Sequence, residues 1–245
     1  MGLEIALIIV GVLIGMVALA SGVTSLWLMG KYYRYNRFEN SLGLTGVEIA
    51  RKILDDNGLQ HIAVKRTGSL LFGNSYSHYF KKVRLRGLIR HETSLTSIGI
   101  GAQKASLAIL DKEGDPDMQK RIRLVPLITF GPFAFIPLIL VGALLDFFMF
   151  GGNGVCTIAL GLLGLLFYVY AIVLSVMTLK TEKKAQEKAY DILQNDYHIT
   201  FEELSALKEI FHIYNVQYIN DIILSSLELI YRVLEIAIAI NSKRD

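Results

Sequence analysis

The sequence predicts a mainly α-helical membrane protein with three to four transmembrane helices, a small cytoplasmic α+β insertion and cytoplasmic C-terminal helices. Its 245 residues are 53% hydrophobic, and the mean hydropathy is +0.44. Three runs carry most of this apolar content, and each is long enough to cross a bilayer. Lys and Arg gather beside these runs, as the positive-inside rule requires of cytoplasmic flanks. The net charge of +3 is too small to indicate nucleic-acid binding, so the expected partner is the lipid bilayer.

The first apolar run predicts an uncleaved N-terminal membrane anchor over residues 1–30. Residues 5–30 contain no charged side chain, and Lys31, Arg34 and Arg37 follow directly. A signal peptide would instead begin with cations and have a shorter apolar core. The cations after the run place the N-terminus outside the cell and the following residues in the cytoplasm.

Residues 31–123 predict a small cytoplasmic α+β domain. Thr45 and Glu48 have capping-box spacing at the start of a helix, and Asn57 and Gly58 form a suitable stop. Residues 61–66 and 79–85 alternate in polarity and predict two short strands, with a loop over 68–78. Residues 94–110 predict a helix of small residues that ends before the breaker cluster at 111–116.

Residues 124–179 predict a transmembrane helical hairpin. The apolar runs 124–150 and 155–179 are joined by a glycine-rich turn without cations at 151–154. Lys180, Lys183 and Lys184 follow the second run, so the turn is expected outside and residues 180–217 inside.

The C-terminal helices are expected over residues 180–245. A charged helix continues from 180 to 195, Thr200 and Glu203 cap a second helix, and the last helix, 219–240, either spans the bilayer or lies along its interface. Four ionisable residues share one face of this last helix at about 100° per residue: Asp221, Glu228, Arg232 and Glu235. Glu228 and Arg232 have the i,i+4 spacing of a helix ion pair. This polar stripe leaves open a transporter or channel subunit.

Several segments together resemble the YugP-like family of bacterial membrane neutral zinc metallopeptidases. These segments are residues 43–59 (GLTGVEIARKILDDNGL), His78-Tyr79, Val83-Arg84-Leu85, Thr93-Ser94-Leu95 and Leu124-Val125-Pro126. The resemblance covers most of the chain and keeps the order of anchor, small domain, hairpin and C-terminal helices. It implies a multi-pass protein of the bacterial cell membrane.

The resemblance also implies a His-Glu-x-x-His motif, in which two histidines bind zinc and the glutamate is the general base. Carried over by position, this motif falls on Gln103-Lys104-Ala105-Ser106-Leu107. The first histidine becomes Gln103, a poor zinc donor, and the second becomes Leu107, which has no lone pair. The glutamate becomes Lys104, which is normally cationic and cannot accept a proton from water. We therefore expect no catalytic residue, no bound metal and no cofactor.

The family places one further glutamate ligand after the last span of the hairpin, at a position that Glu182 matches. We expect Glu182 to be a solvated carboxylate among Lys180, Lys183 and Lys184. His78 and Tyr79 are candidates for lining a former substrate groove, and His91 is expected at a polar helix entry.

These observations favour a catalytically inactive homologue of a zinc metallopeptidase. Such a protein would act as a binding, scaffold or regulatory subunit, with other membrane proteins or further copies of itself as partners. The alternative is an active membrane zinc metallopeptidase whose metal site is rearranged around His78, His91 and Glu182, with zinc as its cofactor. A transporter or channel subunit is the second alternative.

Overall fold

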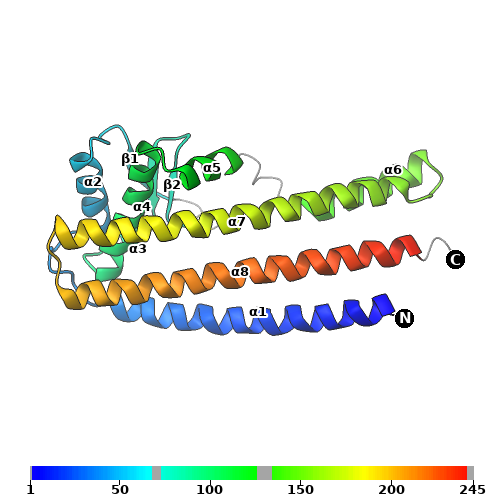
Figure 1. Cartoon of the computed structure of the whole chain (residues 1–245), viewed down its shortest axis with the longest axis horizontal. Helices are drawn as coiled ribbons and strands as arrows, with labels where there is room; N and C mark the ends of the chain where they lie inside the picture. Colours follow the sequence, from blue (N-terminus) through cyan, green and yellow to red (C-terminus); the bar gives the residue numbers. More distant parts are fainter. Residues whose placement is uncertain (1, 68–72, 126–133, 242–245) are drawn as a thin grey trace. The chain divides into compact units, whose positions relative to one another are not determined.

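The computed structural model describes residues 2–67, 73–125 and 134–241 and is mostly helical, with one small sheet (Figure 1). The chain divides into two compact units. We call Thr24–Arg123 with Met177–Val216 the sheet unit, and Met1–Val23, Leu124–Val176 and Gln217–Asp245 the helical unit. Three long helices contribute residues to both: α1 (Gly2–Tyr35), α7 (Val155–Asn195) and α8 (Phe201–Asn241).

Two of the described helices, α1 and α7, are long and apolar enough to cross a membrane. A third apolar helix, α6 (Phe135–Met149), is shorter, with 15 residues. The predicted span 124–150 includes residues 126–133, which lie outside the described residues. The structure thus supports a mainly helical protein with two candidate membrane helices and a small sheet.

The sheet unit begins with α2 (Gly46–Asp56), whose predicted capping box is confirmed. The Thr45 hydroxyl accepts a hydrogen bond from the Glu48 backbone N–H at 3.3 Å, and the Glu48 carboxylate accepts one from the Thr45 N–H at 2.8 Å. The helix ends at Asn57, and Gly58 takes the left-handed conformation with φ of 68°. Its apolar face is fully buried and contains Ile49, Ala50, Ile53 and Leu54.

The three strands are β1 (Ala63–Arg66), β2 (Ser75–Ser77) and β3 (Lys82–Leu85), in the order β1-β3-β2. β1 pairs with β3 in parallel, and β2 pairs with β3 antiparallel. Both predicted strands are present but shorter than expected. β2 lies in the predicted loop 68–78, because a strand of three residues is too short to show an alternating pattern.

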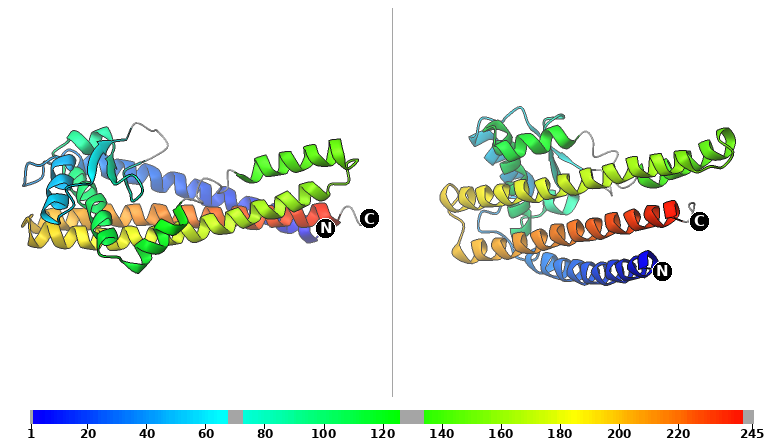
Figure 2. Two further views of the ribbon diagram at one scale, coloured as in Figure 1. Left: turned by 90° about the horizontal axis from the view of Figure 1, so that it is seen from above. Right: turned by 45° about the vertical axis from the view of Figure 1, so that its right-hand side comes forward.

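The helix predicted over 94–110 is α4 (Leu95–Lys112), with Ser94 as its N-cap. Every residue from Leu95 to Leu110 is buried, and α4 packs against α2, β2 and β3 (Figure 2). A Cβ on Gly101 would lie 2.5 Å from the Gly46 carbonyl oxygen, so α2 and α4 approach this closely only because Gly101 has no side chain.

Two short helices flank α4. α3 (Gly87–His91) precedes it, and α5 (Pro116–Leu124) follows it. The segment His91–Leu95, expected as a polar helix entry, connects these helices: His91 is the last residue of α3, and Ser94 is the N-cap of α4.

In the helical unit, α6 and α7 are joined by the predicted glycine-rich turn, in which Gly151, Gly152 and Gly154 have positive φ. The Asp146 carboxylate accepts hydrogen bonds from the backbone N–H groups of Cys156 at 2.9 Å and Thr157 at 2.8 Å. These bonds satisfy free N–H groups at the start of α7. Asp146, near the end of the apolar run, therefore stabilises the glycine-rich turn between α6 and α7.

The two helices predicted after residue 198 are a single helix, α8, of 41 residues. Thr200 and Glu203 do cap its start: Thr200 N–H donates to Glu203 at 2.9 Å, and the Thr200 hydroxyl accepts from the Glu203 N–H at 3.3 Å. No Gly or Pro occurs from residue 201 to 241, so nothing in the sequence breaks the helix.

Candidate functional site

The centre of the candidate site is the carboxylate of Glu182 on α7, which lies beside α4 within the sheet unit. Gln103 Nε2 donates to Glu182 Oε2 at 2.9 Å, and Lys104 Nζ donates to the same oxygen at 2.6 Å. The structure thus brings together three of the four positions that the resemblance singles out. The fourth, Leu107, lies one turn further along α4, is 1% exposed and belongs to the apolar core.

The other oxygen of Glu182 faces α5. Arg121 Nη2 donates to Glu182 Oε1 at 3.3 Å, and Arg121 Nη1 donates to the Thr181 hydroxyl at 2.8 Å. Two cations and one amide therefore surround one carboxylate, and the cluster links α4, α5 and α7.

The expectation that Glu182 is solvated is wrong, because the residue is only 2% exposed. Neighbouring lysines made the segment look solvated, but they lie on other faces of α7. Ala185 and Ala189, three and seven residues after Glu182, are also fully buried. This helical spacing of small apolar residues was the sequence signal that could have placed Glu182 on a buried face.

Glu182 is ionised in this environment. Burial alone would raise its pKa, but the charges of Lys104 and Arg121 and their hydrogen bonds outweigh burial and lower the pKa below its ordinary value. A buried carboxylate with two hydrogen-bonded cations is a stable charge arrangement only while all partners remain.

The donor set of this site does not fit a zinc ion. Zinc needs three or four nitrogen, sulfur or carboxylate ligands with free lone pairs. Here Glu182 Oε2 already accepts hydrogen bonds from the Lys104 ammonium and the Gln103 amide. The positive charge of Lys104 would also repel a metal cation. Across the described parts of the chain, no group of three or more His, Cys, Asp or Glu side chains is placed to hold a metal ion.

His78 lies in a separate cavity of about 300 Å³ in the sheet unit. His78 Nδ1 and the Tyr76 hydroxyl each lie 2.6 Å from Asp111 Oδ2, and Gln119 Nε2 donates to Asp111 Oδ1 at 3.1 Å. Burial would raise the pKa of Asp111, but the bonds from Tyr76 and His78 lower it. Asp111 thus holds the His78 ring in place, a contact between residues 33 positions apart that no sequence motif indicates.

Tyr79, the other predicted groove residue, is 55% exposed, and its hydroxyl donates to the Ile122 carbonyl at 3.0 Å. It does not line the His78 cavity. A former substrate groove at His78 and Tyr79 stays a prediction.

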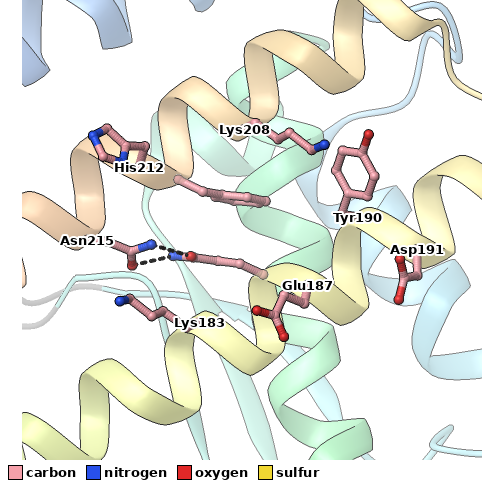
Figure 3. Close-up of a pocket in the computed structure, with 9 residues that line it drawn as sticks. Lys183, Glu187, Tyr190, Asp191, Lys208, His212 and Asn215 are labelled. Atoms are coloured by element: carbon pink, nitrogen blue, oxygen red, sulfur yellow. Dashed lines mark hydrogen bonds between the residues drawn. The ribbon is translucent and has the colours of Figure 1, made fainter.

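A second cavity, of about 360 Å³, lies between the α7 and α8 segments of the sheet unit (Figure 3). Gln186 and Asn215 exchange two side-chain hydrogen bonds across it, at 3.1 and 2.8 Å. Lys208 Nζ lies 4.5 Å from the centre of the Tyr190 ring. These polar side chains bond mainly to one another, so their contacts connect α7 to α8 within the sheet unit.

The polar stripe of α8 lies in the helical unit. Arg232 forms an ion pair with Glu235, three residues later, at 2.7 Å. Its partner is therefore Glu235 and not Glu228, which has the i,i+4 spacing noted in the sequence. Asp221 accepts a hydrogen bond from Gln217 at 3.1 Å.

Comparison with known proteins identifies the family. A family model described as "Putative neutral zinc metallopeptidase" matches residues 8–237. The chain is 24% identical over 199 residues to the "Putative membrane protease YugP" of Bacillus subtilis (strain 168), an alignment that covers 81% of this chain and 84% of that protein. No solved structure matches the chain. The chain therefore belongs to the family of the "Putative neutral zinc metallopeptidase" model, which confirms the resemblance to YugP-like proteins.

Proposed function

We propose that this chain is a catalytically inactive member of its family and acts as a binding, scaffold or regulatory subunit for other proteins of the bacterial cell membrane. The observation that carries the proposal is the ion pair between Lys104 and Glu182, at 2.6 Å. Lys104 stands where the family motif requires a general base, and its partner Glu182 stands where the motif requires a metal ligand. An ammonium that pairs with the remaining ligand supplies neither function.

The rest of the chain supports a retained binding role. The sheet unit keeps a closely packed core around α4, and two helices are long and apolar enough to anchor the chain in a membrane. The charge pattern further favours three to four membrane spans, with the N-terminus outside and the sheet unit in the cytoplasm. In this arrangement the partner is another membrane protein or a second copy of the chain.

The test is the metal content of the full-length chain purified in mild detergent without chelator. We expect less than stoichiometric zinc, with no change in Glu182→Gln or His78→Gln. Glu187→Gln is the matched control, because Glu187 is an exposed carboxylate on the same helix. Stoichiometric zinc that is lost in Glu182→Gln or His78→Gln, but kept in Glu187→Gln, would establish the rearranged metal site and overturn the proposal.

A gain-of-metal variant tests whether the positions correspond to the family motif. The triple substitution Gln103→His, Lys104→Glu and Leu107→His supplies two imidazoles and a carboxylate next to Glu182. We expect this variant to bind about one zinc per chain and to lose it when Glu182→Gln is added. Failure to bind zinc in a folded triple variant would contradict the correspondence.

Co-purification from native membranes tests the binding role. We expect a membrane protein, or a second copy of the chain, to be recovered in fixed ratio after cross-linking. Recovery of the chain alone as a monomer would contradict the scaffold role.

A further inference from the structure

The outward face of the small sheet is basic. In the parallel pair, Lys65 lies in register with Arg84, and Ala63 lies in register with Lys82. Residues in register on neighbouring strands point to the same side of a sheet, and successive residues alternate sides. Val64 and Val83 therefore point inward, where Val83 is fully buried, while Lys65, Lys82 and Arg84 share the opposite side. We call these three residues the basic sheet face.

The segment of the chain that carries this face contains only basic charged residues. Residues 57–91 contain seven Lys or Arg residues and no Asp or Glu. Among the ion pairs of the described residues, none joins the basic sheet face to an acidic side chain. Like charges on adjacent strands repel each other. The face is therefore arranged for an anionic partner from outside the chain.

An exposed aromatic side chain accompanies these cations. Phe80 is 67% exposed, with Lys82 Nζ at 4.5 Å and the Arg84 guanidinium carbon at 5.6 Å from its ring centre. Tyr79, next to it, is 55% exposed. Aromatic rings beside Lys and Arg are typical of segments that lie at the headgroup level of a membrane.

We propose that the basic sheet face and Phe80 dock onto the anionic headgroups of the bilayer. The chain itself favours a membrane over an acidic protein or a nucleic acid, because it carries two helices long and apolar enough to cross one. The sheet unit begins at Thr24, inside the first of these helices, and Tyr32 and Tyr35 of that helix pack against the core of the unit. The sheet unit is therefore continuous with a helix that can cross the membrane, which keeps it close to the lipid surface. Docking does not depend on whether the chain binds zinc.

The test uses the full-length chain in nanodiscs of phosphatidylcholine, with or without phosphatidylglycerol as the anionic lipid. The chain has one tryptophan, Trp27, so Phe80→Trp in a Trp27→Phe background gives a single probe on the docking surface. We expect lipids brominated near the headgroup to quench this probe when phosphatidylglycerol is present. The quenching should weaken with added salt, because salt screens the attraction.

Paired charge variants identify the docking residues. A lysine near an anionic bilayer accounts for about a fivefold change in binding, so Lys65→Gln with Lys82→Gln should reduce the docked-to-undocked ratio about 25-fold. The matched control is Lys52→Gln with Lys208→Gln, because both lysines lie over aromatic rings of the sheet unit, as Lys82 does over Phe80. This control removes the same charge and should keep the quenching. Removing like charges from the outer side of a sheet should not unfold it, and circular dichroism checks this.

Three outcomes would overturn the proposal. One is equal quenching with and without phosphatidylglycerol. Another is an equal loss of quenching in both paired variants. The third is a probe that responds to added polyglutamate or RNA but not to anionic lipid, which would assign the face to a different macromolecule.

Discussion

Glu182→Gln should destabilise the protein strongly, since it removes the carboxylate that neutralises the buried Lys104 and the partly buried Arg121. The side chains of Glu182 and Lys104 are 3% and 7% exposed, and Arg121 is 16% exposed. After the substitution, Lys104 and Arg121 face each other across a neutral amide. Removing one partner of a buried ion pair costs about 3–5 kcal/mol, because the remaining charge stays buried and uncompensated.

The expected loss can be measured as a shift of the thermal midpoint. For a chain of this size, about 1 kcal/mol corresponds to roughly 2–4 °C, so the midpoint should fall by about 6–20 °C. Thermal unfolding of the detergent-solubilised chain, followed by far-ultraviolet circular dichroism, would measure it. Glu187→Gln, on the exposed side of the same helix, should change the midpoint by less than about 2 °C, as surface substitutions usually do.

A charge-free variant separates charge from packing. Lys104→Met combined with Glu182→Leu removes both charges of the Lys104–Glu182 pair and keeps apolar volume, and such replacements are often neutral for stability. Arg121 keeps its charge in this variant, but its side chain is 16% exposed and stays bonded to Thr181, so most of the loss should be recovered. The reasoning is refuted if Glu182→Gln melts like the wild type, or if the charge-free variant is as unstable as Glu182→Gln.

Four further predictions concern stability. The pKa of Glu182 in the folded protein lies below its ordinary 4.5. The stabilisation that the ionised carboxylate provides is therefore complete above about pH 4.5 and is lost as the pH falls through the lowered pKa. The charge-free variant should lose this part of the acid dependence of the thermal midpoint. Gly101→Ala should lower the free energy of unfolding by about 1–3 kcal/mol, because the added methyl group overpacks against α2. The Cβ of Gly22→Ala would meet nothing within 4 Å, so this variant should not be destabilised. Thermal melts of both variants check this. Asp146→Ala should cost about 1–3 kcal/mol, because two N–H groups at the start of α7 lose their acceptor, and a melt that matches the wild type would contradict the capping role. Thr45→Ala should cost about 1 kcal/mol through the lost N-cap of α2, seen as a small drop in midpoint, and an unchanged midpoint would count against the cap.

Local signals in the sequence predicted the parts of the fold that depend on neighbouring residues. The capping boxes at Thr45 and Thr200 and the glycine turn after α6 are each specified within a few positions. The three-residue strand β2 was missed, because its place depends on hydrogen bonds to β3. The division of the last segment into two helices was also wrong, since its change from charged to apolar does not break a helix.

The candidate site was predictable only in part. The family motif identified Gln103, Lys104 and Glu182 as positions of interest, but not the contacts among them. Those contacts join residues 61 to 79 positions apart and include Arg121, which no motif marks. The burial of Glu182 arises from the packing of α7 on α4, and the lysines beside it obscured the small-residue spacing that indicates this face.

The pairing of Lys104 with Glu182 has a consequence for metal supply. In metal-dependent folds, binding of the ion contributes to folding, so chelators or starvation can unfold the protein. Here the positive charge beside the carboxylate is a side chain of the same polypeptide, made with every copy. On the proposed function, we expect the core around α4 to keep its charge balance whatever the zinc supply, so that its stability does not respond to chelators.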